Sequence, residues 1–540
     1  MNTFRIIGSR DGQVLEATIE PGLTLAQHLY LAGAFTARPL CSGAGRCGLC
    51  QARFLSESPD PLPEERERIS AIRLEKGWRL TCRRPPVPGS RVRAALDQDE
   101  TDIHPLPGPC PAVSQAASLG IDLGTTSVQW LFSRGGEVLR GAFHNPQLGA
   151  GSEVMSRLAL ARIPSGAARL RQAVVRAVRQ VLEGLPCLPS RICLAGNSCM
   201  TYLALGMDAS GLAKAPYRLD WSGGAMATLD EGLPGVYIPP LLAPFVGGDV
   251  SAGLMALAFR DGPSGPPYLL ADLGTNGEFA LVLPGGDVLV ASVPMGPALE
   301  GVGMAHGMLA GPGVAVAFEV VPGGLKPVLF EGAPGYSEAT CLASRPRLRP
   351  AAAGNGEGSV RGVSGTGYLS LLSRLRGLGA VTETGRFAPQ ASSPLAARVL
   401  AGLQASGGGP CLEVGGARLQ ATDVEALLKV KAAFSAAVKV LLAEAGVAFA
   451  DLSAVCLAGA LGEYVRPLDL ESLGFFPPGG AAKVRVVGNT SLEGACLAAA
   501  SERARLWLEE LPGRTRLVEV VSAPYFQSIY LDAMRFSYAG

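Results

Sequence analysis

The chain has 540 residues, and its 47 Lys and Arg against 46 Asp and Glu give a formal net charge of +1. A charge so close to neutral argues against a nucleic-acid binder, and no run of 18 or more apolar residues is available to span a bilayer. The start, MNTFRIIGSR, lacks the apolar core of a signal peptide and the length predicts about three or four domains, so we expect a multidomain cytoplasmic protein.

The first 96 residues have the pattern of a small mixed domain. An Asp-Gly turn at Asp11 and Gly12 separates two short alternating segments, which is typical of a hairpin. Residues 23–32 (LTLAQHLYLA) have the spacing of an amphipathic helix. The strands expected around it are residues 3–7, 13–19, 50–54, 78–82 and 91–96. This order predicts a β-grasp domain of the ferredoxin type over residues 1–96.

Four cysteines in this domain are spaced like the ligands of a 2Fe-2S cluster. Such a cluster needs four thiolates, three from one tight loop and one from a distant strand. The pattern here is C-x5-C-x2-C followed by a fourth cysteine, so the first gap is one residue longer than in plant-type ferredoxins. Glycines between the first three cysteines allow the loop to fold tightly around the sulfides. The expected metal ligands are Cys41, Cys47, Cys50 and Cys82.

Other interpretations of the four cysteines are a zinc site, a disulfide pair or free thiols. Zinc usually takes two close pairs, whereas this sequence has a triplet and a single cysteine, and disulfides require an oxidising compartment. The glycines also form a literal GxGxxG, but a cysteine, Cys47, lies inside it and no clear crossover helix follows. The spacing therefore favours a 2Fe-2S cluster that moves single electrons.

The domain carries a small positive charge, and a linker follows it. Residues 1–96 hold 14 Lys and Arg and 9 Asp and Glu. Such a surplus of basic residues usually marks a solvated surface, and a docking face for an acidic partner is the alternative. Residues 97–117 are charged and then Pro-rich, which is typical of a linker. The stretch with His104 and Gly108 nearly matches D-x-H-x-x-G, a signature in which the histidine binds cobalt. The gap between the histidine and the glycine is one residue too long.

Beyond the linker the chain contains a duplicated motif. LGIDLGTTSVQWLF (residues 119–132) and YLLADLGTNGEFALVL (residues 268–283) each have an apolar strand, a turn D-L-G-T-[TN] and a second alternating strand. A third strand follows each copy, from Glu137 and from Asp287. A single turn of this kind also occurs in ordinary hairpins and would indicate little. Two copies in equivalent contexts indicate a duplicated fold. We divide this part into a middle domain over 118–206 and a C-terminal domain over 207–540.

The turn chemistry suits a nucleotide phosphate and Mg²⁺. A glycine lets the backbone approach, turn N–H groups and hydroxyls donate to phosphoryl oxygens, and an aspartate holds the metal directly or through water. No G-x-x-x-x-G-K-[ST] occurs, so this is not a P-loop site. The phosphate-binding candidates are Gly124, Thr125, Thr126, Gly274, Thr275, Asn276 and Gly277. Asp122 and Asp272 are the expected Mg²⁺ positions, and Asp249 or Glu300 is the candidate that orients the attacking water. Glu278 is either a second metal partner or a strand-end carboxylate.

The two turns resemble the phosphate 1 and phosphate 2 loops of the superfamily that holds acetate kinase, sugar kinases, heat-shock ATPases and actin. The resemblance implies α+β and α/β domains in one chain: a β-grasp 2Fe-2S ferredoxin, then duplicated ribonuclease-H-like lobes that close on ATP. It also implies a Gly-rich strand and turn that touches adenosine. Residues 454–463 (AVCLAGALGE) with Gly459 supply one candidate, for which an ordinary strand end is the alternative, and Gly365 is a further cofactor-binding candidate.

Several further motifs make the chain similar to the reductive activators of corrinoid proteins. They include N-P-Q from Asn145 with Arg157 downstream, G-N-S-C-M from Gly196, G-G-D ending at Asp249, G-N-T-S from Gly488, and the tail PYFQSIYLDAMRF. One departure is Ser364, where we expect relatives to carry cysteine. The resemblance covers almost the whole chain.

This resemblance implies that one electron passes from the 2Fe-2S cluster to the inactive Co(II) corrinoid of a methyltransferase system, which regenerates Co(I). A plant-type cluster has a potential near −400 mV and Co(I) is a stronger reductant, so the transfer is uphill. A gap of one or two hundred millivolts corresponds to about 2 to 5 kcal/mol, which ATP can supply. The implied partners are the corrinoid protein, an upstream electron donor and, through the superfamily alone, a second copy in a homodimer.

Two other functions remain open from the sequence. One is a small-molecule kinase with a fused ferredoxin redox domain, and the other is a non-catalytic redox scaffold. A kinase would give a phosphorylated metabolite, whereas both complete phosphate loops argue against a decayed scaffold.

Overall fold

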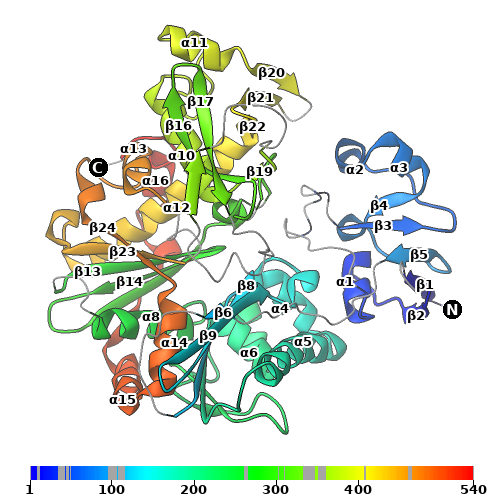
Figure 1. The fold of residues 1–540 in the computed structure, drawn as a ribbon, viewed down its shortest axis with the longest axis vertical. Helices are drawn as coiled ribbons and strands as arrows, with labels where there is room; N and C mark the ends of the chain where they lie inside the picture. The colour runs from blue at the N-terminus through cyan, green and yellow to red at the C-terminus, as the bar shows by residue number, and fades with distance from the viewer. Residues whose placement is uncertain are drawn as a thin grey trace.

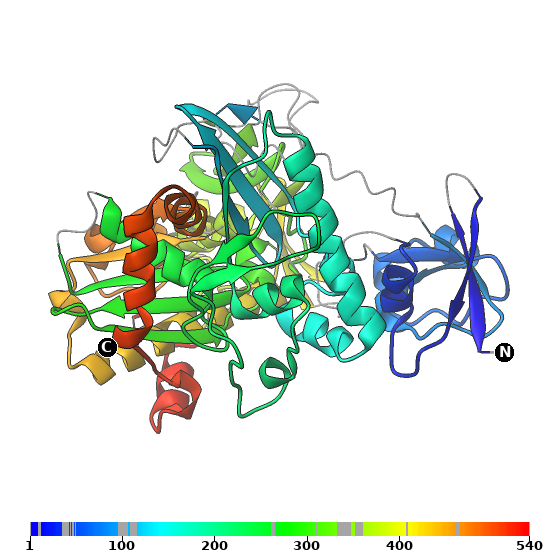
Figure 2. The ribbon, with the colours of Figure 1, turned by 90° about the horizontal axis from the view of Figure 1, so that it is seen from below.

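The structure is a computed structural model, and it describes residues 2–8, 12–34, 43, 45, 48, 50–94, 106–107, 116–260, 265–301, 303–308, 310–331, 347–350, 360–406, 409–459 and 465–538. Figure 1 shows a separate N-terminal region beside two larger lobes, and Figure 2 shows the same arrangement from below. No helix within the described ranges is long and apolar enough to cross a membrane.

The N-terminal region is a five-stranded sheet with the order β2-β1-β5-β3-β4. Parallel β1 and β5 lie at its centre, and α1 packs its apolar side on the sheet, with Thr24 capping the helix N-terminus. The elements are β1 (Thr3–Gly8), β2 (Val14–Thr18), α1 (Leu25–Leu31), β3 (Gln51–Phe54), α2 (Pro63–Arg68), α3 (Ala71–Glu75), β4 (Trp78–Leu80) and β5 (Arg91–Ala94). The predicted strands and helix are confirmed, whereas the pair α2 and α3 was not predicted. The Asp-Gly turn includes Asp11, which lies outside the described residues.

The first lobe is built on a seven-stranded sheet with the order β11-β12-β10-β7-β8-β9-β6. Strands β7, β10 and β12 are parallel, so their carboxyl ends meet at one edge. The strands are β6 (Leu106–Pro107), β7 (Ser118–Leu123), β8 (Ser127–Arg134), β9 (Glu137–His144), β10 (Arg191–Gly196), β11 (Ala225–Ala227) and β12 (Val236–Ile238). The helices are α4 (Val154–Ala161), α5 (Pro164–Glu183), α6 (Ser198–Leu205) and α7 (Ser210–Ala213).

This sheet has two consequences for the expected domain boundaries. Because β11 and β12 pair into it, the first lobe extends past residue 206, where we placed its end. The linker contributes β6, which pairs with the edge strand β9, while the rest of residues 97–115, including His104, lies outside the described residues.

The second lobe repeats the central layout in a six-stranded sheet with the order β24-β23-β13-β14-β15-β25. In both lobes the strand that carries the aspartate, β7 or β13, pairs in parallel with one neighbour and forms an antiparallel hairpin with the strand that follows it. Asp122 pairs with Gln129 in the first hairpin, and Asp272 pairs with Glu278 at the same place in the second. The predicted duplication is therefore confirmed. The strands are β13 (Tyr268–Leu273), β14 (Asn276–Val282), β15 (Val288–Pro294), β23 (Ala454–Ala458), β24 (Val484–Gly488) and β25 (Thr515–Leu517).

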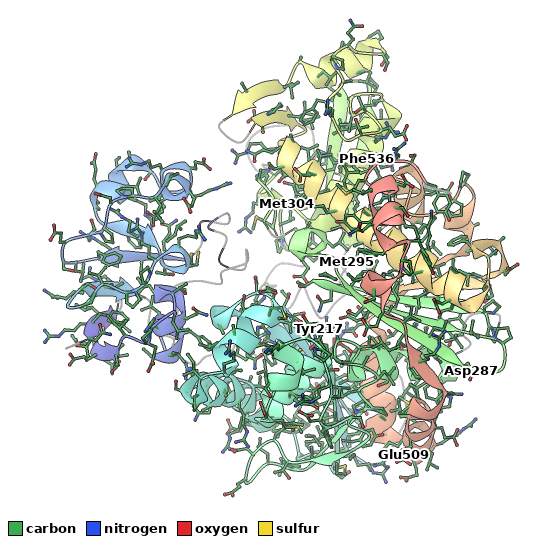
Figure 3. The ribbon with its side chains drawn as sticks, turned by 180° about the vertical axis from the view of Figure 1, so that it is seen from behind. Tyr217, Asp287, Met295, Met304, Glu509 and Phe536 are labelled. Carbon is green, nitrogen blue, oxygen red and sulfur yellow. The ribbon has the colours of Figure 1, made fainter. Side chains whose placement is uncertain are left out.

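Helices cover both faces of this sheet. The long α12 (Ala421–Ala445) packs on β14 and β15, and the C-terminal α16 (Phe526–Asp532) packs on α12. Met295, Met304 and Phe536, which Figure 3 labels, belong to this large buried core. The other helices of the lobe are α13 (Pro467–Ser472), α14 (Thr490–Ala500) and α15 (Glu502–Glu510).

A smaller subdomain is inserted between β15 and α12, and it forms the top of the view in Figure 1. It holds a four-stranded sheet with the order β18-β17-β16-β19 and a three-stranded sheet with the order β20-β21-β22. Its elements are β16 (Val314–Val321), β17 (Gly324–Glu331), β18 (Arg347–Pro350), β19 (Gly362–Val363), α10 (Gly365–Gly377), α11 (Pro394–Leu400), β20 (Leu403–Ser406), β21 (Gly409–Val414) and β22 (Ala417–Gln420).

Two helices join the lobes. Helix α8 (Gly248–Phe259) follows the first sheet, and α14 packs against α8 and against β7 and β10. The approach is close because small residues meet: a Cβ on Gly494 would lie 2.0 Å from the Ala252 carbonyl oxygen, and one on Gly120 would lie 2.6 Å from the Cys496 sulfur. The N-terminal residues of both helices belong to the cleft described below.

Candidate nucleotide site and cluster region

The cleft between the lobes is lined by nearly all the predicted nucleotide-site residues. Asp122 and Asp272 are on strands β7 and β13, and Asp249 lies in the first turn of α8. The described cavity lining includes Asp122, Gly124, Thr125, Thr126, Asp249, Asp272, Gly274, Thr275, Asn276, Glu278, Glu300, Ser364, Gly365 and Gly459. Segments separated by more than 300 residues thus form one site.

Gly277 is the exception, because the described lining of the cavity does not include it. It pairs with Val293 in the sheet, and a Cβ there would lie 2.3 Å from the Met295 sulfur. The glycine therefore leaves room for the Met295 and Phe279 side chains beside β14, and its role as a phosphate ligand stays a prediction.

Asp122 is held by side chains from the far end of the chain. Asn489 Nδ2 and Ser491 Oγ donate 2.7 Å hydrogen bonds to its two carboxylate oxygens. Both donors stand at the N-terminus of α14, where the helix dipole favours a negative charge. They belong to the G-N-T-S motif at residues 488–491, in which nothing local indicates a contact with Asp122.

Glu300 connects the two phosphate loops. One carboxylate oxygen accepts a 2.7 Å hydrogen bond from Thr126 Oγ1, and the other accepts a 2.9 Å bond from Thr275 Oγ1. Thr126 belongs to the first lobe and Thr275 to the second, so this carboxylate spans the cleft. Each of its oxygens accepts a bond from one of these hydroxyls.

The phosphate 1 loop is supported from behind by further polar groups. Asn145 Nδ2 donates to the Gly124 carbonyl oxygen at 2.7 Å, and Arg157 Nη2 donates to the Thr125 carbonyl oxygen at 2.6 Å. Asn197 Nδ2 reaches Thr125 Oγ1 at 3.4 Å. These residues come from the N-P-Q and G-N-S-C-M motifs of the sequence, which thereby acquire a structural role.

Glycines are required where the second lobe approaches the loops. A Cβ on Gly459, whose φ is +81°, would lie 2.4 Å from Asp272 Oδ1. A Cβ on Gly365 would lie 1.8 Å from the Leu299 carbonyl oxygen, so the N-terminus of α10 packs directly on the segment that carries Glu300. Ser364 caps this helix, accepting a 3.1 Å hydrogen bond from Gly367 N. Residues 460–463 of the predicted adenosine segment lie outside the described residues.

The cleft carboxyl groups have raised pKa values because they are removed from bulk water and close to one another. Burial, with Asp249 and Asp122 nearby, raises the pKa of Asp272 to about 8. Burial raises the pKa of Asp249 to about 7, although backbone N–H groups oppose the shift. Burial also raises the pKa of Glu278 well above its ordinary value. Burial and mutual proximity therefore disfavour the ionised forms of these carboxyl groups, and a bound cation would favour them.

Mg²⁺ and ATP fit this set of residues. Among the described side chains, no three His, Cys, Asp or Glu groups converge to hold a metal alone. Mg²⁺ commonly uses one or two carboxylates together with nucleotide phosphates and water, which is what Asp122 and Asp272 can offer. The turn N–H groups and the Thr125, Thr126 and Thr275 hydroxyls are suited to phosphoryl oxygens.

In the N-terminal region the structure describes two of the four predicted cluster ligands, Cys50 and Cys82, while Cys41 and Cys47 lie outside the described residues. Both described thiols are buried, and they flank the paired residues Gln51 and Leu80 of adjacent strands. The Thr81 N–H donates to the Cys50 carbonyl oxygen at 2.7 Å, which ties the two segments together. The two thiols belong to one small buried cluster of side chains, which fits their expected role as ligands of one metal cluster.

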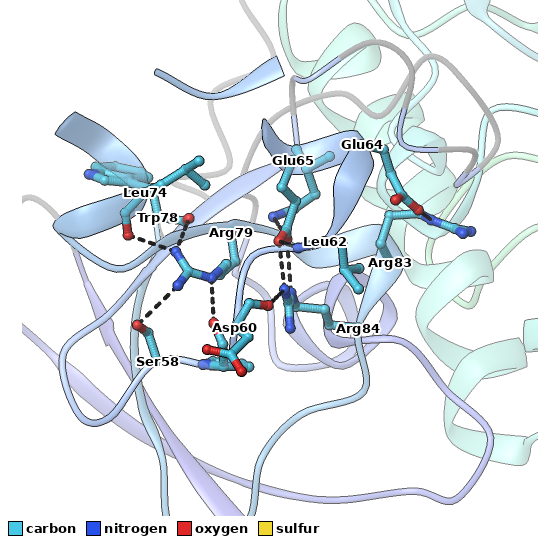
Figure 4. A network of polar contacts seen from close by, with 12 residues as sticks. Ser58, Asp60, Leu62, Glu64, Glu65, Leu74, Trp78, Arg79, Arg83 and Arg84 are labelled. Atoms are coloured by element: carbon cyan, nitrogen blue, oxygen red, sulfur yellow. Dashed lines mark hydrogen bonds and ion pairs between the residues drawn. The ribbon is translucent and has the colours of Figure 1, made fainter. Parts of the chain in front are cut away.

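A buried ion pair supports the Cys82 segment, and Figure 4 shows it. Glu65 on α2 accepts 2.8 Å hydrogen bonds from Leu80 N and from Arg84 Nε, and Arg84 Nη2 is 2.5 Å from its second oxygen. The Glu65 side chain is fully buried and that of Arg84 is 9% exposed. One carboxylate therefore fixes the backbone two residues before Cys82 and the side chain two residues after it.

Fold and site together define a two-lobed ATPase of the acetate kinase, sugar kinase, heat-shock ATPase and actin superfamily, joined to a ferredoxin-like region. The family models agree: "C-terminal domain of RACo the ASKHA domain" matches residues 267–539, and "RACo middle region" matches residues 117–261. The chain belongs to the RACo family, the reductive activators of corrinoid proteins. The expected fold class and family are confirmed.

Individual proteins support this assignment. The corrinoid activation enzyme RamQ of Eubacterium limosum is 27% identical over 451 residues, which cover 76% of this chain and 69% of RamQ. The [Co(II) methylated amine-specific corrinoid protein] reductase of Methanosarcina barkeri is 30% identical over 259 residues, 48% of this chain and 43% of that protein. The function of this chain is thus corrinoid activation.

Two further proteins match the chain, a solved structure over almost its whole length and a curated sequence over a short segment. A solved structure of a reductive activator for corrinoid, iron-sulfur protein covers 99% of both chains at 21% identity, with a TM-score of 0.63. A component of the Na(+)-translocating NADH-quinone reductase of Chlamydia pneumoniae is 36% identical over 72 residues, 13% of this chain and 16% of that component.

Proposed function

We propose that the chain uses MgATP to drive one electron from a 2Fe-2S cluster, held by Cys41, Cys47, Cys50 and Cys82, to the Co(II) corrinoid of a partner protein. The cluster supplies a one-electron carrier of low potential. The partner is a corrinoid protein of a methyltransferase system, as the names of the relatives suggest. The remaining steps are assigned to residues of the cleft.

The observation that carries this proposal is the Glu300 bridge. Because Glu300 joins a hydroxyl from each phosphate loop, the loops cannot separate without breaking a hydrogen bond to this carboxylate. Phosphate oxygens placed between the loops would compete for the same hydroxyls. The position of the lobes therefore depends on what occupies the cleft, which is the property needed to couple nucleotide to a conformational change.

Two carboxylates were candidates for orienting the attacking water, and the geometry favours Asp249. Both oxygens of Glu300 already accept hydrogen bonds from hydroxyls of the two loops, whereas Asp249 Oδ1 accepts from the Val250 N–H of its own helix. A catalytic base works best with a pKa near the working pH, and that of Asp249 is about 7. We assign Asp249 to the water and Glu300 to the closure of the cleft.

The assignment is tested with full-length Asp272→Ala and Cys47→Ser proteins. Asp272→Ala should abolish ATP hydrolysis and leave the visible spectrum of the cluster intact, because the two sites are separate. Cys47→Ser should lose the visible spectrum of the cluster and keep ATP hydrolysis. Retained ATP turnover in the first variant would exclude the nucleotide assignment, and a fully coloured second variant would exclude the ligand set.

A further inference from the structure

Helix α1 of the ferredoxin-like region lies on the first lobe, as Figures 1 and 2 show. Its Tyr30 is 2% exposed and belongs to the buried core of that lobe, together with Ala150 and Val154. Leu23 and Leu31 pack against the same core. The contact is therefore an apolar interface between two domains and not a loose surface approach.

A cation–π contact adds specificity to this interface. The Arg169 guanidinium, on α5, lies 5.6 Å from the centroid of the Tyr30 ring. Such contacts are attractive because the face of an aromatic ring is negative and the guanidinium is positive. Because Arg169 is on the lobe and Tyr30 on the ferredoxin-like region, it can be removed without disturbing either core.

Arg157, the residue that holds the phosphate 1 loop, lies about one turn beyond Val154 on α4. Its side chain is fully buried, and besides Thr125 it donates to the Gly151 carbonyl oxygen at 2.9 Å and to Gln147 Oε1 at 3.3 Å. Among the described residues no carboxylate forms an ion pair with it. The ionisable groups that act on it are Tyr30, Glu300 and Glu153.

We propose that docking of α1 on the first lobe and binding of nucleotide in the cleft are coupled through Tyr30 and Arg157. The docked helix packs on Ala150 and Val154, the segment that Arg157 bonds at the Gly151 carbonyl oxygen, and Arg157 also holds the Thr125 carbonyl oxygen. Anything that orders this loop around a phosphate should therefore favour docking, and docking should strengthen nucleotide binding by the same factor. The position of the ferredoxin-like region would then report the state of the cleft. This coupling rests on nucleotide binding from the proposed function but not on electron transfer.

The first test measures the affinity of the full-length, cluster-loaded protein for a non-hydrolysable ATP analogue with Mg²⁺. Tyr30→Ala should weaken binding about tenfold and Arg169→Ala about threefold, within the usual range of coupling between sites. Arg73→Ala is the matched control, because Arg73 stacks on Trp78 at 4.1 Å wholly inside the ferredoxin-like region, and its affinity should equal that of the wild type. Equal affinities for Arg169→Ala and Arg73→Ala would overturn the coupling.

The reciprocal test measures hydrogen exchange in residues 25–32. Saturating nucleotide should slow exchange there in the wild type but not in Arg157→Lys, because a lysine cannot make three donations at fixed angles. Unchanged exchange in a wild type that binds nucleotide would overturn the coupling alone. A wild type that binds no nucleotide would overturn the proposed function as well.

Discussion

Thr126 and Glu300 are 174 residues apart in the chain, and the Thr126 hydroxyl donates a 2.7 Å hydrogen bond across the cleft to the Glu300 carboxylate. The same carboxylate accepts from Thr275, so a single side chain holds both phosphate loops. This relationship underlies our proposal of a closing role for Glu300 and a hydrolytic role for Asp249.

Substitution of the two carboxylates should therefore have different effects. Asp249→Asn should lower ATP turnover at least about a hundredfold with little change in nucleotide affinity, because loss of a positioned base costs roughly 10²–10⁴ in rate. Glu300→Gln should mainly alter nucleotide affinity, since an amide cannot accept from both hydroxyls as a carboxylate does. Steady-state turnover and calorimetric affinity measured on both variants distinguish the roles. A larger loss of turnover in Glu300→Gln would reverse the assignment.

Gly459→Ala should disable the nucleotide site by displacing Asp272. The new Cβ would lie 2.4 Å from Asp272 Oδ1, in addition to the strain of φ +81°. Gly479→Ala is the matched control, because Gly479 has the same φ of +81° and no described atom within 4 Å of its Cβ position. We expect at least a tenfold loss of MgATP affinity, about 1.4 kcal/mol, in the first variant only. Similar losses in both would attribute the effect to backbone strain.

Stability without nucleotide or metal should fall as the pH rises. The pKa values of Asp249 and Asp272 are raised to about 7 and about 8, so in this range the folded protein binds protons that the unfolded chain has released. These two groups contribute their full stabilisation of the folded state below the pKa of a carboxyl group in the unfolded chain, which is about 4. That stabilisation is lost as the pH rises through about 7 and about 8. Melting temperatures should drop between about pH 5.5 and about pH 8.5.

The comparison variant for this pH dependence is Asp272→Asn, which removes one titrating group. Its melting curve should be flatter over the same range, and added MgATP should flatten that of the wild type. MgATP affinity should increase with pH, because bound cation displaces the protons. A pH dependence that is identical in wild type and Asp272→Asn would contradict the raised pKa of Asp272.

The sequence was sufficient for much of this site. Local patterns in the sequence were enough to predict three features. These are the D-L-G-T turns, Asp249 after its two glycines, and the two apolar strands with their hairpins. The contacts of Asp122 with Asn489 and Ser491 were not predictable, since the partners lie 367 and 369 residues away. The strands β11 and β12 were missed because three residues are too few to show alternation, which misplaced the end of the first lobe.

The ferredoxin-like region should depend on Glu65 far more than on its neighbour Glu64. Breaking a buried ion pair leaves an uncompensated charge and costs about 3 kcal/mol or more, whereas the Glu64–Arg83 pair is exposed. Glu65→Gln should lower the unfolding temperature of the region and hasten loss of visible absorbance, and Glu64→Gln should do neither. Thermal melts followed at a visible wavelength provide the check. Equal behaviour of the two variants would contradict the supporting role of Glu65 at Cys82.

The most direct measurement follows Co(I) absorbance after the reduced full-length protein is mixed with a Co(II) corrinoid protein, with and without MgATP. The wild type should form Co(I) only with MgATP, Asp272→Ala should form none under either condition, and Cys82→Ser should form none. Equal Co(I) formation without ATP, or by Asp272→Ala, would contradict the claim that the nucleotide cleft drives the electron uphill.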